Sequence, residues 1–176
     1  MKQSSKTAIC GMIAALSVVI MMLTIIPVMT YAAPAFAGIM LMLIVIEINK
    51  KWAFGVYAAV GILSLLLATD KEASVMYVAF FGYYPIIKAV LESKLPRVLE
   101  WIVKFLIFNV TMVAAYFVLI RVFGISMEDM NELGKYGPLI LLGMGNVVFL
   151  VFDIAITRIA TLYLLKWQKQ FRKLFK

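Results

Sequence analysis

The sequence contains no histidine and only one cysteine, Cys10. A single thiol cannot form an internal disulfide. Without histidine the chain also lacks Cys/His metal sites and every catalytic arrangement that depends on an imidazole base. No Gly-rich phosphate-binding loop of the Walker type is present either. If the protein takes part in ATP-driven work, the ATPase must therefore be a different chain.

Polar stretches are short, and long apolar runs fill most of the chain. Of the 176 residues, 65% are hydrophobic, and the mean hydropathy is +1.02. A helix that crosses a bilayer needs about 20 largely apolar residues. We therefore predict an all-α integral membrane protein whose single domain, residues 1–176, is one bundle of six transmembrane helices. The expected spans are 7–27, 31–48, 52–68, 73–90, 98–122 and 138–165.

Basic residues outnumber acidic residues by 17 to 9, and they flank the apolar runs. If both termini are cytoplasmic, fourteen of the 17 basic residues fall on that side, which the positive-inside rule favours. We expect cytoplasmic termini, no nucleic-acid binding, and anchoring of the basic tail, residues 166–176, to anionic lipid. The expected location is the plasma membrane of a bacterium, as a multi-pass protein. Three tryptophans fall at the cytoplasmic ends, as interfacial anchors do: Trp52, Trp101 and Trp167.

The sixth run carries polar residues at helical spacing, namely Asn146, Asp153, Thr157 and Thr161. A carboxylate is costly in hydrocarbon and is by default a candidate functional residue. Asp153 also has a structural interpretation, an ion pair with a lysine of a neighbouring helix. The sequence leaves open whether Asp153 is structural or takes part in coupling. The two candidate lysines are Lys88 and Lys104.

Asn146 and Asn109, which lies near the middle of the fifth run, allow two interpretations. They are candidate substrate contacts near mid-depth, or they hold two helices together by hydrogen bonds. Tyr77 and Tyr84 of the fourth run, with Asp70 in the loop before it, would suit a flat, neutral or cationic organic molecule. Ordinary aromatic packing is the alternative for the tyrosines, and Tyr77, Phe81 and Tyr84 are expected to share one helix face.

Two acidic loops on the outer side also have a local interpretation. Thr69-x-x-Glu72 and Ser126-x-x-Asp129 resemble capping boxes, which start helices without any ligand. In the first run Thr7, Gly11 and Ala15 recur every four residues. Small residues at this spacing let another helix approach closely, so this stripe is a candidate docking surface for a partner.

These features resemble the substrate-binding S component of an energy-coupling-factor (ECF) transporter. The likeness rests on six spans in about 20 kDa, the basic charge, the stripe of the first helix and the capped loop after the third. Where that family has Ala-x-x-x-Ala, this chain has Gly11-x-x-x-Ala15. The resemblance implies a substrate site beneath the outer loops, and a membrane coupling subunit with two cytoplasmic ATPases as partners. Without histidine, the chain is unlike the nickel and cobalt members.

The sequence therefore predicts a substrate-capture subunit for a small organic micronutrient, with no cofactor and no metal. The alternative is a non-transporting membrane scaffold of cell-envelope assembly, which needs the docking stripe but no ligand pocket. A membrane enzyme is disfavoured, because no acid/base pair or activated nucleophile converges in the pattern. The expected substrate contacts are Asn146, Asn109, Tyr77, Tyr84 and Asp70, and the expected docking residues are Gly11, Ala15 and Thr7.

Overall fold

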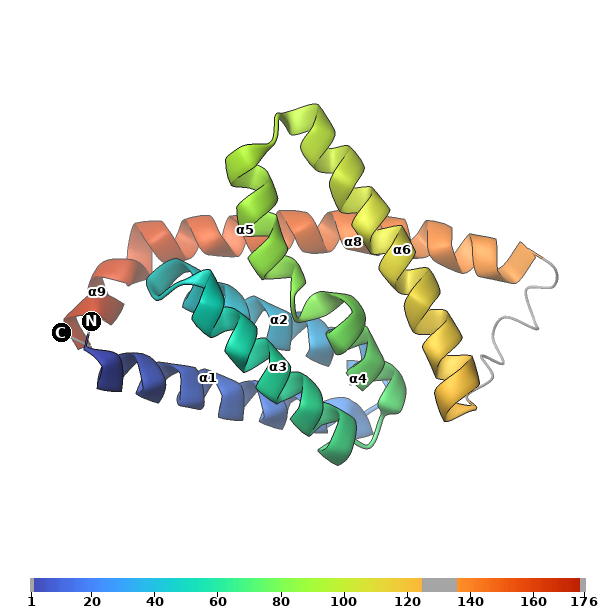
Figure 1. Ribbon diagram of the computed structural model, residues 1–176, viewed down its shortest axis with the longest axis horizontal. Coiled ribbons are helices and arrows are strands. Elements are labelled where there is room, and N and C mark those ends of the chain that lie inside the picture. Colours follow the sequence, from blue (N-terminus) through green and yellow to red (C-terminus); the bar gives the residue numbers. More distant parts are fainter. Residues whose placement is uncertain (1, 125–135, 175–176) are drawn as a thin grey trace.

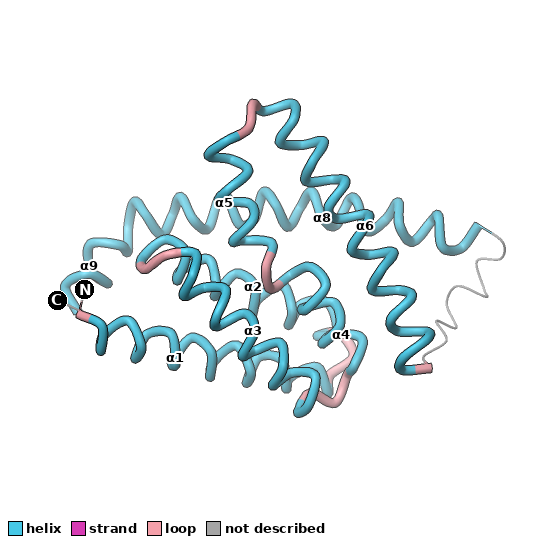
Figure 2. The backbone as a smooth tube through the Cα atoms, in the orientation of Figure 1, coloured by secondary structure: helices cyan, strands magenta, loops and turns pink. Residues whose placement is uncertain are grey.

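The computed structural model describes residues 2–124 and 136–174, and every regular element in those ranges is a helix (Figures 1 and 2). The first three long helices follow one another through short connections, and the fourth span is divided into several elements. In chain order the elements are α1 (Gln3–Met22), η1 (Leu23–Ile25), α2 (Met29–Glu47), α3 (Lys50–Leu67), α4 (Lys71–Met76), η2 (Tyr77–Phe81), α5 (Tyr84–Lys94), α6 (Arg97–Phe123), α8 (Gly137–Leu162), η4 (Tyr163–Trp167) and α9 (Gln168–Leu174).

Six helical stretches of the described chain are long and apolar enough to cross a membrane, as expected of a multi-pass membrane protein. This agrees with the predicted number of helices. Both termini lie at the same end of the molecule (Figure 1), as an even number of crossings requires. The stretches are Gln3–Ile25, Met29–Glu47, Lys50–Leu67, Lys71–Lys94, Arg97–Phe123 and Leu139–Phe171.

The last helix runs further than the apolar pattern predicted. It continues from α8 through the π-helical segment η4 into α9, which contains most of the predicted basic tail. Gln168 Nε2 donates a hydrogen bond of 3.0 Å to Glu47 Oε1 at the end of α2. The ring of Phe171 lies 6.1 Å from that of Tyr163. This part of the tail therefore packs on the bundle.

The fourth span is interrupted near its middle. Helix α4 leads into η2, and a turn at Gly82 precedes α5, which has Pro85 in its first turn. Proline lacks the main-chain donor that a continuous helix would need, and the chain departs from α-helix just before it. The η2 backbone also lies against α2: a Cβ atom on Gly38 would stand 2.2 Å from the main-chain oxygen of Phe81. Glycine is required at this close approach.

The turn before α4 corrects the predicted capping box by one residue. The N-cap is Asp70, whose side chain accepts hydrogen bonds from the backbone N–H groups of Glu72, at 2.9 Å, and Ala73, at 3.3 Å. Aspartate is at least as good an N-cap as threonine, so the helix begins after Asp70 instead of after Thr69. Glu72 accepts a hydrogen bond of 2.7 Å from the hydroxyl of Tyr31 on α2. The second predicted box, Ser126-x-x-Asp129, lies outside the described residues.

Two buried clusters form most of the core. The first lies between α1, α2 and α3 and receives Tyr77 from η2. The second is mainly aromatic and joins α2, η2, α5, α6 and α8. At its centre the ring of Phe80 lies 4.6 Å from that of Tyr84 and 5.1 Å from that of Phe108. The aromatic residues of the fourth span therefore tie the N-terminal helices to α6 and α8.

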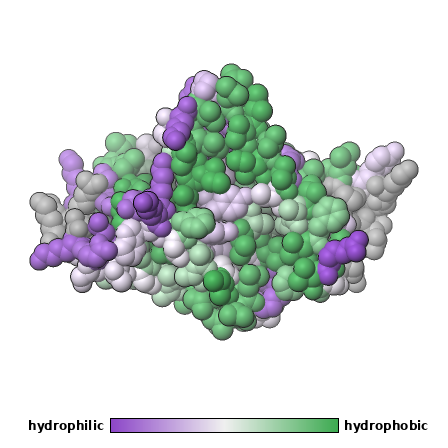
Figure 3. Space-filling view, viewed as in Figure 1, coloured by the Kyte–Doolittle hydropathy of each residue, from purple (hydrophilic) through white to green (hydrophobic). Residues whose placement is uncertain are grey.

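The outer surface is largely apolar. Large hydrophobic side chains remain exposed along α6 and α8 as well as α1 and α3. Figure 3 shows apolar residues over much of the visible face, with hydrophilic residues toward the end that carries the termini, along one side of the projecting α5–α6 hairpin and in a smaller patch toward the opposite end. This distribution fits helices surrounded by lipid, since bilayer hydrocarbon imposes no cost on exposed apolar side chains.

Candidate functional site

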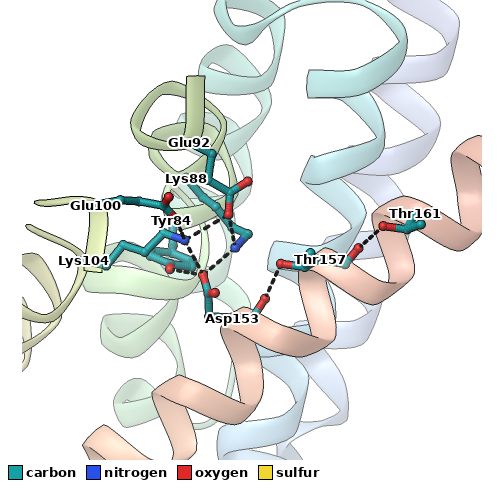
Figure 4. A network of polar contacts seen from close by, with 8 residues as sticks. All are labelled: Tyr84, Lys88, Glu92, Glu100, Lys104, Asp153, Thr157 and Thr161. Atoms are coloured by element: carbon teal, nitrogen blue, oxygen red, sulfur yellow. Dashed lines mark hydrogen bonds and ion pairs between the residues drawn. The ribbon is translucent and has the colours of Figure 1, made fainter. Parts of the chain in front are cut away.

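A buried ion-pair cluster joins α5, α6 and α8 (Figure 4). Asp153 Oδ1 lies 2.6 Å from Lys88 Nζ and 3.1 Å from Lys104 Nζ. The three residues are 3%, 4% and 1% exposed, respectively. The predicted ion pair of Asp153 is therefore confirmed, and it involves both lysines.

Two further carboxylates, those of Glu92 and Glu100, complete this charge cluster. Glu92 Oε1 lies 2.5 Å from Lys88 Nζ and 2.9 Å from Lys104 Nζ, and Glu100 Oε1 lies 2.5 Å from Lys104 Nζ. The hydroxyl of Tyr84 also donates to Asp153 Oδ1, at 2.5 Å. Sequence reasoning missed both glutamates, although Lys88-x-x-x-Glu92 and Glu100-x-x-x-Lys104 have the spacing of intrahelical ion pairs.

The cluster fixes three helices together. Lys104 has three carboxylate partners and Lys88 has two, so neither buried ammonium group is left without a counter-charge. Pairing of this kind is what makes buried charge tolerable in a low-dielectric interior. Thr157 and Thr161 stand apart from the cluster, because their hydroxyls donate to main-chain oxygens of α8 four residues earlier, at 2.9 and 2.8 Å.

A second polar contact, separate from the charge cluster, joins α6 to α8 through Asn109 and Asn146. The amides of Asn109 and Asn146 donate to each other's Oδ1 atoms at 2.9 and 3.0 Å. Each amide also donates to the carbonyl oxygen four residues earlier in its own helix, at 2.8 Å. The predicted interhelical hydrogen bond is therefore confirmed. Both N–H donors of each amide are used within the chain, which leaves only a carbonyl lone pair on each for any ligand.

The other predicted substrate contacts lie elsewhere. Tyr77 is fully buried in the first core cluster, and its hydroxyl has no hydrogen-bond partner among the described residues. Tyr84 is bound to Asp153, and Asp70 caps α4. The predicted common face of Tyr77, Phe81 and Tyr84 is wrong, because the π-helical turns of η2 and the turn at Gly82 rotate the later residues into the second cluster. The five predicted substrate contacts therefore do not line one common site.

An open groove runs between α1 and α3 at the end of the bundle near the termini. It measures about 440 Å³. Thr7 and Gly11 of the predicted docking stripe lie on it, while Ala15 is exposed on α1 outside its lining. A Cβ atom built on Gly11 or Gly55 would meet nothing within 4 Å. The lining residues are Thr7, Cys10, Gly11, Ala14, Lys51, Trp52, Gly55, Val56 and Ala59.

Sequence reasoning found one wall of this groove and missed the other. Lys51, Gly55 and Ala59 recur every four residues on α3, the same spacing as the stripe on α1. That second pattern was readable in the sequence, but only the fold places the two helices beside each other.

Chemically, the described residues offer charge pairing and an open apolar groove. They contain no group of three or more His, Cys, Asp or Glu side chains that could hold a metal ion. Comparisons with protein-family models, with curated proteins and with solved structures found no match to this chain.

Proposed function

We propose that the protein is the substrate-capture subunit of an ATP-driven importer for a small organic micronutrient, vitamin-like and neutral or cationic. A membrane coupling subunit and two cytoplasmic ATPases would supply the energy. The proposed setting is a bacterial plasma membrane, with both termini in the cytoplasm.

The observation that carries this proposal is the unoccupied small-residue surface of α1. Thr7, Gly11 and Ala15 are all exposed, and among the described residues no atom of another helix stands within 4 Å of a Cβ position on Gly11. In membranes, close backbone approach at small residues is a main source of helix–helix affinity, because lipid tails are as apolar as leucine. A chain without a nucleotide-binding loop that offers such a surface is well suited to work through a partner.

The docking test is affinity purification of a tagged chain from its native membranes in mild detergent. We expect a membrane protein and ATPases to co-purify with the wild type, and the Gly11→Leu variant to lose them. Gly143→Leu is the matched control, because Gly143 on α8 is also exposed and also has open space at its Cβ position. Recovery of the same partners with Gly11→Leu would contradict docking through α1.

The second candidate is the non-transporting scaffold of cell-envelope assembly. One observation favours it: Asn109, Asn146, Tyr84 and Asp70 all make hydrogen bonds within the chain. A screen of small organic molecules by thermal stability separates the two candidates. The capture proposal expects a ligand whose stabilising effect disappears in Asn146→Ala. Co-purification of envelope-synthesis proteins, with no stabilising ligand, would support the scaffold.

A further inference from the structure

We propose that the groove between α1 and α3 is a binding site for one anionic phospholipid, with an acyl chain along its floor and the phosphate beside Lys51. The inference goes beyond the proposed function and rests on it only for the cytoplasmic placement of the termini. Because Gly11 also belongs to the proposed docking surface, the lipid would occupy the groove in the chain without its partner. It rests on the shape of the groove, on the chemistry at its two ends and on its place in the bundle.

The floor of the groove has the form of a channel for a slender apolar chain. Gly11 and Ala14 of α1 and Gly55 and Ala59 of α3 line it with small or absent side chains, and the buried side chains of Cys10 and Val56 also line it. From Lys51 to Ala59 the groove follows eight residues of helix, about 12 Å at 1.5 Å per residue. The groove is open along its length and has a volume of about 440 Å³.

The end of the groove near the termini is basic and amphipathic. Lys51 and Trp52 both line it, and Lys50 precedes them in the first turn of α3. Within the described residues Lys51 makes no hydrogen bond or ion pair, and the first turn of α3 contains no acidic residue. Cations at a helix N-terminus add to the positive end of the helix dipole, so this end favours an anion. Tryptophan is typical of the headgroup level.

The position of these groups selects a lipid over other anions. The positive-inside bias puts the α2–α3 connection at the cytoplasmic surface, and the anionic lipids of that leaflet are attracted to lysines close to the membrane. Basic pockets between transmembrane helices on this side are typical headgroup sites. A free phosphate or nucleotide would satisfy Lys51 but would leave the apolar floor empty.

The selectivity must come from the headgroup. An acyl chain gains little by leaving bilayer hydrocarbon for an apolar groove, because the two surroundings are equally apolar. One lysine beside the headgroup should favour binding of an anionic lipid over a neutral lipid about fivefold, which corresponds to about 1 kcal/mol. The shape of the groove allows an acyl chain to bind, and the charge of Lys51 selects an anionic headgroup.

The test is native mass spectrometry of the full chain released from nanodiscs made of equal parts phosphatidylglycerol and phosphatidylcholine. We expect one phosphatidylglycerol to stay bound to the wild type. Lys51→Gln should lower the phosphatidylglycerol preference about fivefold. Its control is Lys94→Gln, which removes an exposed lysine at the end of α5 and should change nothing.

A second pair of variants tests the floor. Gly55→Leu fills the groove and should abolish retention of the lipid, whereas Gly143→Leu adds the same side chain on α8 and should keep it. Equal retention of the two lipids would mean ordinary boundary lipid and would overturn the proposal. Unchanged phosphatidylglycerol retention in both Lys51→Gln and Gly55→Leu would place the lipid elsewhere and would also overturn it.

The same experiment separates this site from the docking proposal. It uses the chain without any partner, so loss of the lipid leaves the co-purification result unaffected. If the groove retains no lipid and Gly55→Leu abolishes co-purification of the coupling subunit, the occupant is a protein helix and the lipid site is refuted. If the lipid is retained and no ATPase ever co-purifies, the lipid site stands and the proposed function fails.

Discussion

Lys104 is the more heavily paired of the two buried lysines, and its removal tests the energetics of the charge cluster. In the wild type, Lys104 and Lys88 face the three carboxylates of Asp153, Glu92 and Glu100. Lys104→Met leaves one cation among three carboxylates, whereas Lys88→Met leaves Lys104, which contacts all three. Breaking a buried ion pair costs about 3–5 kcal/mol. We expect Lys104→Met to lower the free energy of unfolding by an amount near the upper end of this range, and Lys88→Met by an amount near the lower end.

The assay is reversible unfolding in detergent micelles, in which the free energy of unfolding of each variant is compared with that of the wild type. Lys94→Met is the control: this exposed lysine makes none of the described ion pairs, so its loss should stay within about 0.5 kcal/mol. Adding Glu100→Gln to Lys104→Met removes one stranded carboxylate and should recover part of the loss. For two residues in direct contact, the effects of the two substitutions on the free energy of unfolding typically differ from their sum by about 0.5–3 kcal/mol.

Two results would refute this reasoning. If Lys104→Met is no more destabilising than Lys94→Met, the ammonium group is not held in a buried ion pair. If Lys88→Met proves the more costly of the two buried changes, the distribution of partners within the cluster is different from the one described.

Three further predictions concern other contacts, each measured as a change in free energy of unfolding. Asn109→Leu and Asn146→Leu should show a coupling of about 0.6 kcal/mol, with about 1.7 kcal/mol as an upper value, in a double-mutant cycle; additive effects would contradict the interhelical bond. Asp70→Ala should cost about 1 kcal/mol as a lost N-cap, and Thr69→Ala should cost much less; the reverse order would restore the capping box read from the sequence. Gly38→Ala should destabilise by about 1–3 kcal/mol, because its methyl group would collide with the η2 backbone; an unchanged stability would mean that α2 and η2 are further apart.

The number of spans and the main polar contacts were predictable from the sequence, for a common reason. A polar residue inside an apolar run has few ways to be satisfied, so Asp153 required a cation and the candidates were only Lys88 and Lys104. The same scarcity paired Asn109 with Asn146. In each case the cost of an unpaired polar group in hydrocarbon restricts the solutions far more than apolar packing does.

Residues of the fourth span show where this reasoning fails. Placing Tyr77 and Tyr84 on one face assumed 100° per residue throughout, and a π-helical segment followed by a turn changes that angle. Nothing local in the sequence 77–81 requires the π-helix. The close packing of its backbone against Gly38 of α2 is a tertiary contact, which the local sequence does not show. The α3 wall of the groove was missed for a similar reason, since two stripes become one surface only when their helices are adjacent.

The charge cluster also bears on how the chain can be assembled during synthesis. Two of its ion pairs, Lys88–Glu92 and Glu100–Lys104, join residues four apart, and Lys104–Glu92 joins residues on either side of a short connection. The part of the cluster on the α5–α6 hairpin therefore contains two cations and two carboxylates, so these four charges balance one another before the last helix is made. Only Asp153, 65 residues after Lys88, must come from a later helix. The hairpin can enter the bilayer with these four charges already paired, and α8 then docks by bringing the Asp153 carboxylate to a preformed pair of lysines.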